Sequence, residues 1–152
     1  MRCTFFGHRN APDNIKTILK SAIIQLIEFE GVKSFYIGNN GNFDFLAQCA
    51  LIEIAAERND INCTVVLSHI GEKALCGRVE YTIFPEALEG VIPKFAISKR
   101  NEWLLKKCNF VITYKKHNYS NTQRLIEKAV KKGLKIIALQ EQRGYRPPDI
   151  PL

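Results

Sequence analysis

Three short clusters of glycine, amide, hydroxyl and charged side chains mark places where this chain could bind a charged ligand. They read GHRN at 7–10, GNNGNFD at 38–44 and KKHNYSNT at 115–122. Glycine lets backbone N–H groups approach a ligand closely, and arginine offers a planar set of donors that matches phosphate or carboxylate. Clusters of this composition are typical of anion-binding loops, and a plain surface turn is the alternative for each.

The first cluster combines a glycine, a histidine and an arginine. Gly7 allows a tight turn or a close backbone approach to a ligand. Arg9 could hold a phosphate or carboxylate, and His8 could donate a hydrogen bond or carry a proton. The alternative is a turn with two solvated side chains, and the three residues alone do not decide between them.

The second cluster stands between an apolar run and a long apolar-rich segment. Gly38 and Gly41 free N–H groups for an anion, and the start of a helix would add positive potential. Asp44 in the first helical turn would repel a phosphate, so we expect Asp44 and Asn39 to contact a ribose or a base. Helix capping is the alternative role for Asp44.

Two further groups complete the candidate ligand-binding residues. Arg100 and Asn101 lie near the front of a predicted helix, where one of them could face a pocket while the apolar neighbours pack. Ser120 and Thr122 precede the last predicted helix, whose N-terminus could hold an anion. Plain N-capping by these hydroxyls is the alternative.

The elements that position these clusters alternate along the chain. Continuous apolar runs predict strands, and apolar residues at helical spacing predict the segments between them as helices. Residues 71–94 are irregular and long for a connection, which suggests a lid or a partner surface. The predicted strands are 2–7, 33–38, 62–70, 110–116 and 134–140; the predicted helices lie within 8–31, 43–58, 96–109 and 120–133.

This order predicts an α/β fold: a Rossmann-like, doubly wound, mostly parallel sheet of about five or more strands with helices on both faces. A length of 152 residues suits one domain, 1–152, with a proline-rich irregular tail at about 143–152. Ligands bind such sheets outside the carboxyl ends of the strands, where all three polar clusters fall.

Composition indicates a globular protein that can bury a core, since 46% of the residues are hydrophobic and 24% are charged. No apolar run approaches the roughly 18 residues of a membrane helix, and the N-terminus has no long apolar segment of the secretory type. We therefore expect a cytoplasmic protein with no membrane partner. The sequence leaves the oligomeric state open, and a homo-oligomer is compatible with it.

The five cysteines are scattered and form no C-x-x-C pair, which argues against a disulfide framework and against a zinc site. We expect no metal and no cofactor. The net charge of +7 is uneven: residues 1–60 carry six Lys/Arg against seven Asp/Glu, and residues 61–152 carry sixteen against eight. A basic second half suits a phosphate-bearing ligand or a nucleic acid, and a solvated lysine surface is the alternative.

Three segments together resemble the SLOG superfamily, and more narrowly its small bacterial and phage-associated single-domain members of uncharacterised function. They are CTFFGHR, GNNGNFDFLA and PKFAISKRNEWLLKKCNFVITY, and the resemblance extends from Arg2 to about Leu139. The superfamily joins DNA-processing protein A-like proteins with LOG-type nucleoside-monophosphate phosphoribohydrolases. The resemblance implies a Rossmann-like fold and a nucleotide or nucleotide-derived ligand held at the strand ends by glycine-rich loops.

Enzymatic activity is a separate question, because the LOG-type catalytic motif is incomplete. Arg100-Asn101 matches the Arg-Lys pair of those enzymes with Asn in place of Lys, but the paired glycines after the next strand are missing. If Thr122 aligns with the motif threonine, the acidic position falls on Leu125. We therefore expect ligand binding or sensing; the alternative is hydrolysis of a nucleotide N-glycosidic bond with Asp44 as the catalytic carboxylate, and nucleic-acid binding ranks third.

Overall fold

The computed structural model describes residues 1–116 and 120–140 as six strands, four α-helices and three short 3-10 turns. The predicted tail at about 143–152 lies outside these residues. In chain order the strands and α-helices are β1 (Arg2–Gly7), α1 (Lys16–Glu30), β2 (Ser34–Ile37), α2 (Asn42–Glu57), β3 (Asn62–Val66), β4 (Thr82–Ile83), α3 (Ala96–Lys107), β5 (Phe110–Tyr114), α4 (Asn121–Lys131) and β6 (Lys135–Ala138).

The strands form one sheet in the order β4-β3-β2-β1-β5-β6, and every neighbouring pair is parallel. The predicted α/β class, with a Rossmann-like doubly wound sheet, is confirmed. Strand β4 was not predicted: it is two residues long and sits inside the segment that the sequence marked as irregular. A strand of two residues is too short to show a repeating apolar pattern in the sequence. Only its pairing with Val65 and Val66 identifies it.

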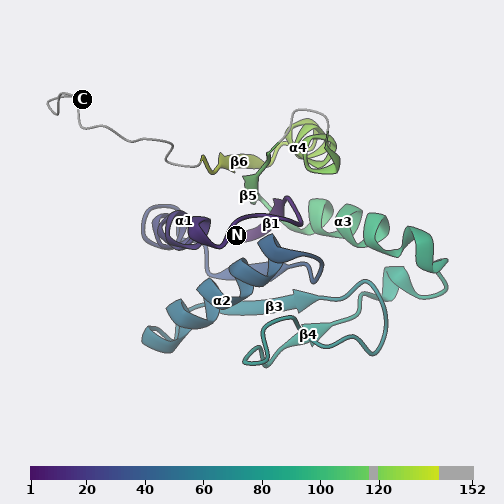
Figure 1. Ribbon diagram of the computed structural model, residues 1–152, viewed down its shortest axis with the longest axis horizontal. Helices are drawn as coiled ribbons and strands as arrows, with labels where there is room; N and C mark the ends of the chain where they lie inside the picture. The colour runs from purple at the N-terminus through teal and green to yellow at the C-terminus, as the bar shows by residue number, and fades with distance from the viewer. Residues whose placement is uncertain (117–119, 141–152) are drawn as a thin grey trace, which may run out of the picture.

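The helices cover both faces of the sheet, α1 and α2 on one and α3 and α4 on the other (Figure 1). Neighbouring residues of a strand point to opposite faces, so Phe5 joins the α1–α2 core and Phe6 the α3–α4 core. Val111 and Ile112 of β5 divide in the same way. The α1–α2 core is the larger of the two, and α3 and α4 leave part of their side of the sheet for a cavity.

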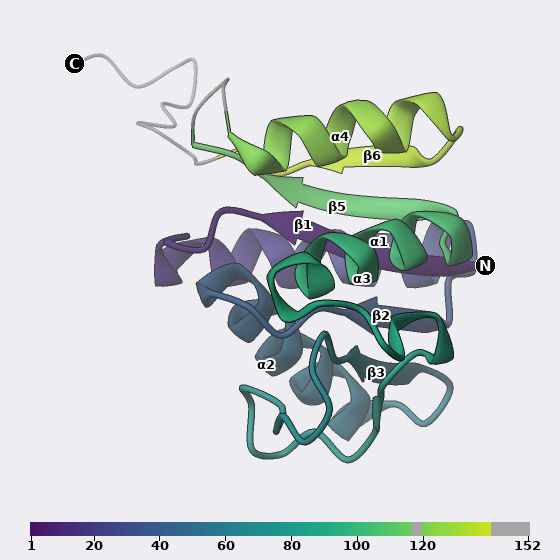
Figure 2. The same ribbon diagram turned by 90° about the vertical axis from the view of Figure 1, so that its right-hand side faces the viewer.

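The carboxyl ends of the strands share one edge of the sheet, on the left in Figure 2. This edge gathers the loop after β1, the loop after β2 and the start of α4, where the described parts of the three polar clusters lie; residues 117–119 of the third cluster are outside the described residues. Within the described part of the chain, no helix combines the length and apolar character needed to span a bilayer.

Candidate functional site

A cavity of about 590 Å³ lies at this edge, above the ends of β1 and β2 and between α3 and α4. It brings together residues that the sequence singled out from four separate regions of the chain. Nine of the eleven predicted site residues line it: Gly7, His8, Arg9, Gly38, Asp44, Arg100, Asn101, Ser120 and Thr122. The other two, Asn39 and Gly41, do not.

The Asp44 carboxylate lies on the floor of the cavity and is 7% exposed. The backbone N–H of Asn40 donates a hydrogen bond to Asp44 Oδ2 at 2.8 Å. Asp44 Oδ1 has no hydrogen-bond partner among the described residues and remains open to a ligand. Burial raises the pKa of Asp44 to about 6, although the Arg100 charge and the Asn40 hydrogen bond act in the opposite direction.

The guanidinium of Arg100 is the second buried charge, at 3% exposed. Arg100 Nη1 donates to Asn40 Oδ1 at 2.6 Å, while Nε and Nη2 donate to Asn101 Oδ1 at 3.3 and 3.0 Å. Burial lowers the pKa of Arg100, and the carboxylates of Asp44 and Glu72 offset part of that effect. A guanidinium has five N–H donors, so three such bonds leave capacity for an incoming acceptor.

Gly38 is the point at which these two charges approach the backbone. A Cβ atom on Gly38 would stand 2.8 Å from Asp44 Oδ2 and 3.0 Å from Arg100 Cζ. Any side chain here would therefore displace the carboxylate or the guanidinium. The space that these two groups occupy explains the glycine after β2.

Gly7 at the end of β1 has a different neighbour, because a methyl group there would overlap the ring of Phe43. Phe43 is the second residue of α2 and stacks on Tyr114, with ring centroids 6.2 Å apart. His8 follows Gly7, donates its N–H to Tyr114 O at 3.0 Å and accepts the N–H of Asn10 on Nδ1 at 3.1 Å. Gly7 therefore serves helix–strand packing, and its backbone also borders the cavity.

Arg9 is exposed and lines the mouth of the cavity. Gly41 packs against Arg9: its φ is 91°, and a Cβ atom on Gly41 would lie 2.6 Å from Arg9 Cβ. Three more cationic side chains, which the sequence did not single out, line the cavity: Lys94, Arg124 and Lys128. Their only sequence signal was the excess of basic residues in the second half of the chain.

Asn39 is buried and directed away from the cavity. Its Oδ1 accepts hydrogen bonds from Gln48 Nε2 at 3.1 Å and from Leu75 N at 2.9 Å, and its Nδ2 donates to Lys73 O at 2.9 Å. The expected contact of Asn39 with ribose or base has no geometric support, because these bonds occupy its amide. Asn40, its neighbour, is the asparagine that borders the cavity and contacts Arg100.

Gln48 is a polar residue that sequence reasoning missed. It is fully buried in α2, where Nε2 donates to Gly38 O at 3.0 Å and Oε1 accepts from Cys76 N at 2.9 Å. One amide thus fixes the loop after β2 against the loop that follows β3. A glutamine inside an apolar helical run was the available signal, since buried amides require partners.

Glu72 holds the loop after β3 in shape. Its Oε1 accepts from His69 N at 2.7 Å and from Ser68 N at 3.2 Å, and its Oε2 lies 3.5 Å from Asn39 Nδ2. Burial would raise the pKa of Glu72, but the hydrogen bonds outweigh it and the pKa is lowered. Part of the segment predicted as a lid or partner surface is therefore hydrogen-bonded to the loop that carries the site.

The start of α4 forms the other wall of the cavity. Ser120 caps the helix by accepting the N–H of Gln123 at 3.2 Å, so the capping alternative holds for Ser120, and its side chain also borders the cavity. Thr122 is buried, and both Thr122 and Leu125 line the cavity. Glu127 lies outside the cavity and accepts from Gln123 Nε2 at 3.2 Å. The carboxylates in the cavity are Asp44 and Glu102.

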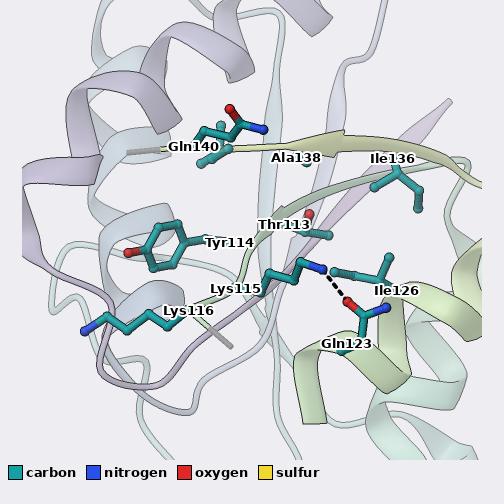
Figure 3. A pocket seen from close by; sticks show the side chains of 10 residues that line it. Thr113, Tyr114, Lys115, Lys116, Gln123, Ile126, Ile136, Ala138 and Gln140 are labelled. Carbon is teal, nitrogen blue, oxygen red and sulfur yellow. Dashed lines mark hydrogen bonds between the residues drawn. The ribbon is translucent and has the colours of Figure 1, made fainter. Parts of the chain in front are cut away.

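A second hollow of about 720 Å³ lies farther along the same edge, over β5 and β6 (Figure 3). Lys115 Nζ crosses it to donate to Gln123 Oε1 at 2.7 Å. Its lining contains no buried charge and none of the predicted site residues. This hollow is larger than the first cavity, but the buried charges favour the first cavity as the functional site.

The arrangement suits a ligand with an anionic part and a hydrogen-bonding part. Among the described residues, no group of three or more His, Cys, Asp or Glu side chains could hold a metal ion. No known family model matches the chain, and no curated protein matches it. We therefore infer the function from the cavity itself.

Proposed function

We propose that this protein binds a nucleotide or a nucleotide-derived ligand in the cavity between α3 and α4. One observation carries the proposal: residues from four distant segments, predicted as ligand contacts, surround a single cavity whose floor holds Arg100 and Asp44. Buried charges cost free energy to keep in the folded state, so a cavity that contains both is a strong candidate for a binding site. The resemblance to the SLOG superfamily supports the same ligand class.

The side chains that line the cavity suit two different parts of such a ligand, its phosphate and its nucleoside. Arg9, Lys94, Arg124 and Lys128 line it with positive charge, which suits phosphate. Asp44 Oδ1 is an open acceptor on the floor and suits the hydroxyl groups of a ribose or an amino group of a base. The phosphate would therefore lie toward the mouth and the nucleoside toward Gly38.

Thermal-shift measurements with a panel of nucleoside mono-, di- and triphosphates and cyclic dinucleotides test this proposal. A ligand at 100 times its Kd adds about 2.7 kcal/mol to the stability of the native state. We expect at least one nucleotide to raise the Tm of the wild type, and Arg9→Ala and Arg100→Ala to reduce the shift.

Arg78→Ala is the matched control, because Arg78 is an exposed arginine outside the cavity. Its shift should equal that of the wild type. Arg9 is exposed and its variant should fold even if Arg100→Ala does not. The proposal is wrong if no nucleotide shifts the wild type, or if Arg9→Ala and Arg78→Ala respond alike.

A second candidate is hydrolysis of a nucleotide N-glycosidic bond, and the observation that favours it is the unengaged Asp44 Oδ1 inside the cavity. A carboxylate there could stabilise positive charge that develops on the ribose. Incubation of each bound nucleotide with the protein should then release free base, and Asp44→Asn should abolish the release. Binding without release of base from any nucleotide would reject this candidate and leave the binding proposal standing.

A further inference from the structure

Strand β4 is an open edge of the sheet, at the bottom of the ribbon in Figure 1. It pairs with β3 on one side: Tyr81 O accepts from Val65 N at 3.0 Å. Ile83 O accepts from Leu67 N at 2.8 Å. In a parallel strand, the residue between two such bonds directs its N–H and C=O to the other side. Thr82 therefore presents both groups outward, and no other segment of the described chain supplies a backbone partner for them.

The side chains at this edge are exposed, and two of them are largely apolar. Tyr81 and Ile83 are two residues apart, so they point to the same face of β4, where they are 68% and 36% exposed. An open edge with apolar side chains is a template for another strand, and proteins commonly block such edges with lysine, proline or brevity. Strand β4 has two residues and Pro85 follows soon after it, so the edge suits a short added segment.

The chain around β4 is acidic, in contrast to the net charge of +7 for the whole protein. Residues 79–93 include three carboxylates, Glu80, Glu86 and Glu89, and no Lys, Arg or His. Glu80 directly precedes Tyr81, and the other two lie in or just after the 3-10 turn Glu86–Leu88 that follows β4. All three are exposed, and none forms an ion pair within the described part of the chain. This negative charge suits a basic partner and disfavours a nucleic acid.

These observations favour one kind of occupant. A helix could cover the apolar side chains, but its backbone groups are already paired and would leave Thr82 without partners. A second copy of the chain would bring the same three carboxylates against each other, which like-charge repulsion disfavours. An extended segment supplies the backbone partners, and its alternating side chains can be basic and apolar in turn.

We propose that the outer edge of β4 binds an extended, basic segment of a partner protein, which pairs with Thr82 as an added strand. Its Lys or Arg side chains lie toward the three carboxylates, and its apolar side chains pack on Tyr81 and Ile83. None of these residues lines the cavity between α3 and α4, so the proposal does not depend on the nucleotide site. It gives a role to the irregular segment 71–94, for which the sequence suggested a lid or a partner surface.

The test measures fluorescence anisotropy of two labelled ten-residue peptides, one that alternates valine with lysine and one that alternates valine with glutamate. We expect saturable binding of the lysine peptide and none of the glutamate peptide. Glu80→Lys combined with Glu86→Lys should weaken the lysine peptide by at least about fivefold and allow the glutamate peptide to bind. Glu30→Lys combined with Glu57→Lys is the control, because it makes the same charge change at exposed positions of α1 and α2. It should alter neither affinity.

Thr82→Pro tests the backbone pairing, because proline has no N–H to donate. The lost N–H faces away from β3, so the Tm should change little while the lysine peptide no longer binds. In the wild type, the lysine peptide should also slow hydrogen exchange of the Thr82 amide and leave that of Gly31, after α1, unchanged. If Thr82→Pro does not fold, the two charge-reversal variants still decide the outcome.

The proposal is overturned if the lysine peptide shows no saturable binding, or if the control double variant weakens it as much as the β4 double variant does. A folded Thr82→Pro protein that binds normally would also overturn it. Sedimentation tests for a second copy: a wild-type dimer that Thr82→Pro converts to a monomer would assign this edge to self-association instead. Nucleotide binding in the cavity is measured separately, so its failure and the failure of peptide binding are distinguishable.

Discussion

Strands β1 and β2 lie side by side and end in similar glycine turns, yet the two glycines make room for different groups. At the end of β1, Gly7 makes room for the ring of Phe43, an apolar side chain of α2. At the end of β2, Gly38 makes room for Asp44 and Arg100, two buried charges. The first turn thus stabilises the fold, and the second shapes the candidate site.

The contrast shows that a glycine after a strand is not in itself a ligand signal. The sequence placed Gly7 and Gly38 in the same class because both precede polar residues at a strand end. Only the packing distinguishes them, since Phe43 and Asp44 are adjacent in sequence but reach different glycines. Substitutions at the two turns should therefore separate stability from ligand binding.

The largest effect is expected for Gly7→Ala. The added methyl group would overlap the Phe43 ring, which is 1% exposed and has little space to move into. We expect a loss of about 3 kcal/mol in the free energy of unfolding, at the upper end of the usual overpacking costs. Urea denaturation measures it, and the folded fraction should retain its ligand affinity. A loss below about 1 kcal/mol would show that this turn is not limited by packing.

Asp44→Asn should change how stability depends on pH. The pKa of Asp44 is raised to about 6, so the folded protein holds this proton more tightly than the unfolded chain does. The stability conferred by the protonated form is complete below about pH 4 and is lost as pH rises through 6. Relative to Asp44→Asn, the wild type should lose on the order of 2–3 kcal/mol between pH 4 and pH 7.

Asp60→Asn should change the pH dependence of stability in the opposite direction, so it serves as the control for Asp44→Asn. The hydrogen bond from Arg58 lowers the pKa of Asp60, so its contribution is present at neutral pH and is lost as pH falls. Denaturation of both variants at several pH values provides the comparison. If the Asp44→Asn and wild-type stabilities run parallel across this range, the buried carboxylate does not titrate as described.

Gln48→Ala tests whether the loop after β2 needs its support. The substitution removes the partners of Gly38 O and Cys76 N, both of them buried groups. We expect a loss of about 2 kcal/mol in stability, since buried groups without partners are costly, together with weaker nucleotide binding. Gln25→Ala, on the exposed side of α1, is the matched control and should alter neither quantity by much. Unchanged binding in a folded Gln48→Ala protein would show that Gly38 holds its position without this amide.

Gly38→Ala should have the smallest effect on stability and a specific effect on binding. The methyl group would stand 2.8 Å from Asp44 Oδ2 and 3.0 Å from Arg100 Cζ, so a side chain on the cavity floor must shift. We expect roughly tenfold weaker nucleotide binding, about 1.4 kcal/mol, with a stability loss smaller than that of Gly7→Ala. Titration calorimetry measures it. If Gly38→Ala is the more destabilising variant and binds normally, the contrast between the two turns is reversed.

Much of the fold could be predicted from sequence because continuous apolar runs alternate with helical periods along the whole chain. Strand β4 could not, since Thr82 and Ile83 have no recognisable pattern outside their pairing with β3. Within the site, Asp44 and Arg100 were identified by residue type and by their place near strand ends. That they share one glycine neighbour could not be foreseen, because it depends on the packing of α3 against β1 and β2.

Asn39 and Asn40 also show that the direction of a side chain could not be predicted from the sequence. Asn39 and Asn40 are adjacent and chemically identical, and the sequence favoured Asn39 as the ligand contact. The backbone turns Asn39 toward Gln48 and Leu75, and Asn40 toward Arg100. One residue of difference in a loop reverses the direction of a side chain, and no composition or spacing rule predicts that.

An NMR titration of ¹⁵N-labelled protein, with the nucleotide that gives the largest thermal shift, shows whether the ligand binds in the cavity between α3 and α4. We expect the amide signals of Gly7, Gly38 and Asp44 to move with ligand, while those of Gly31 and Gly133, which follow the C-terminal ends of α1 and α4, stay in place. Signals that move only around Lys115 and Gln123, in the hollow over β5 and β6, would contradict it, as would a titration that moves no signal at all.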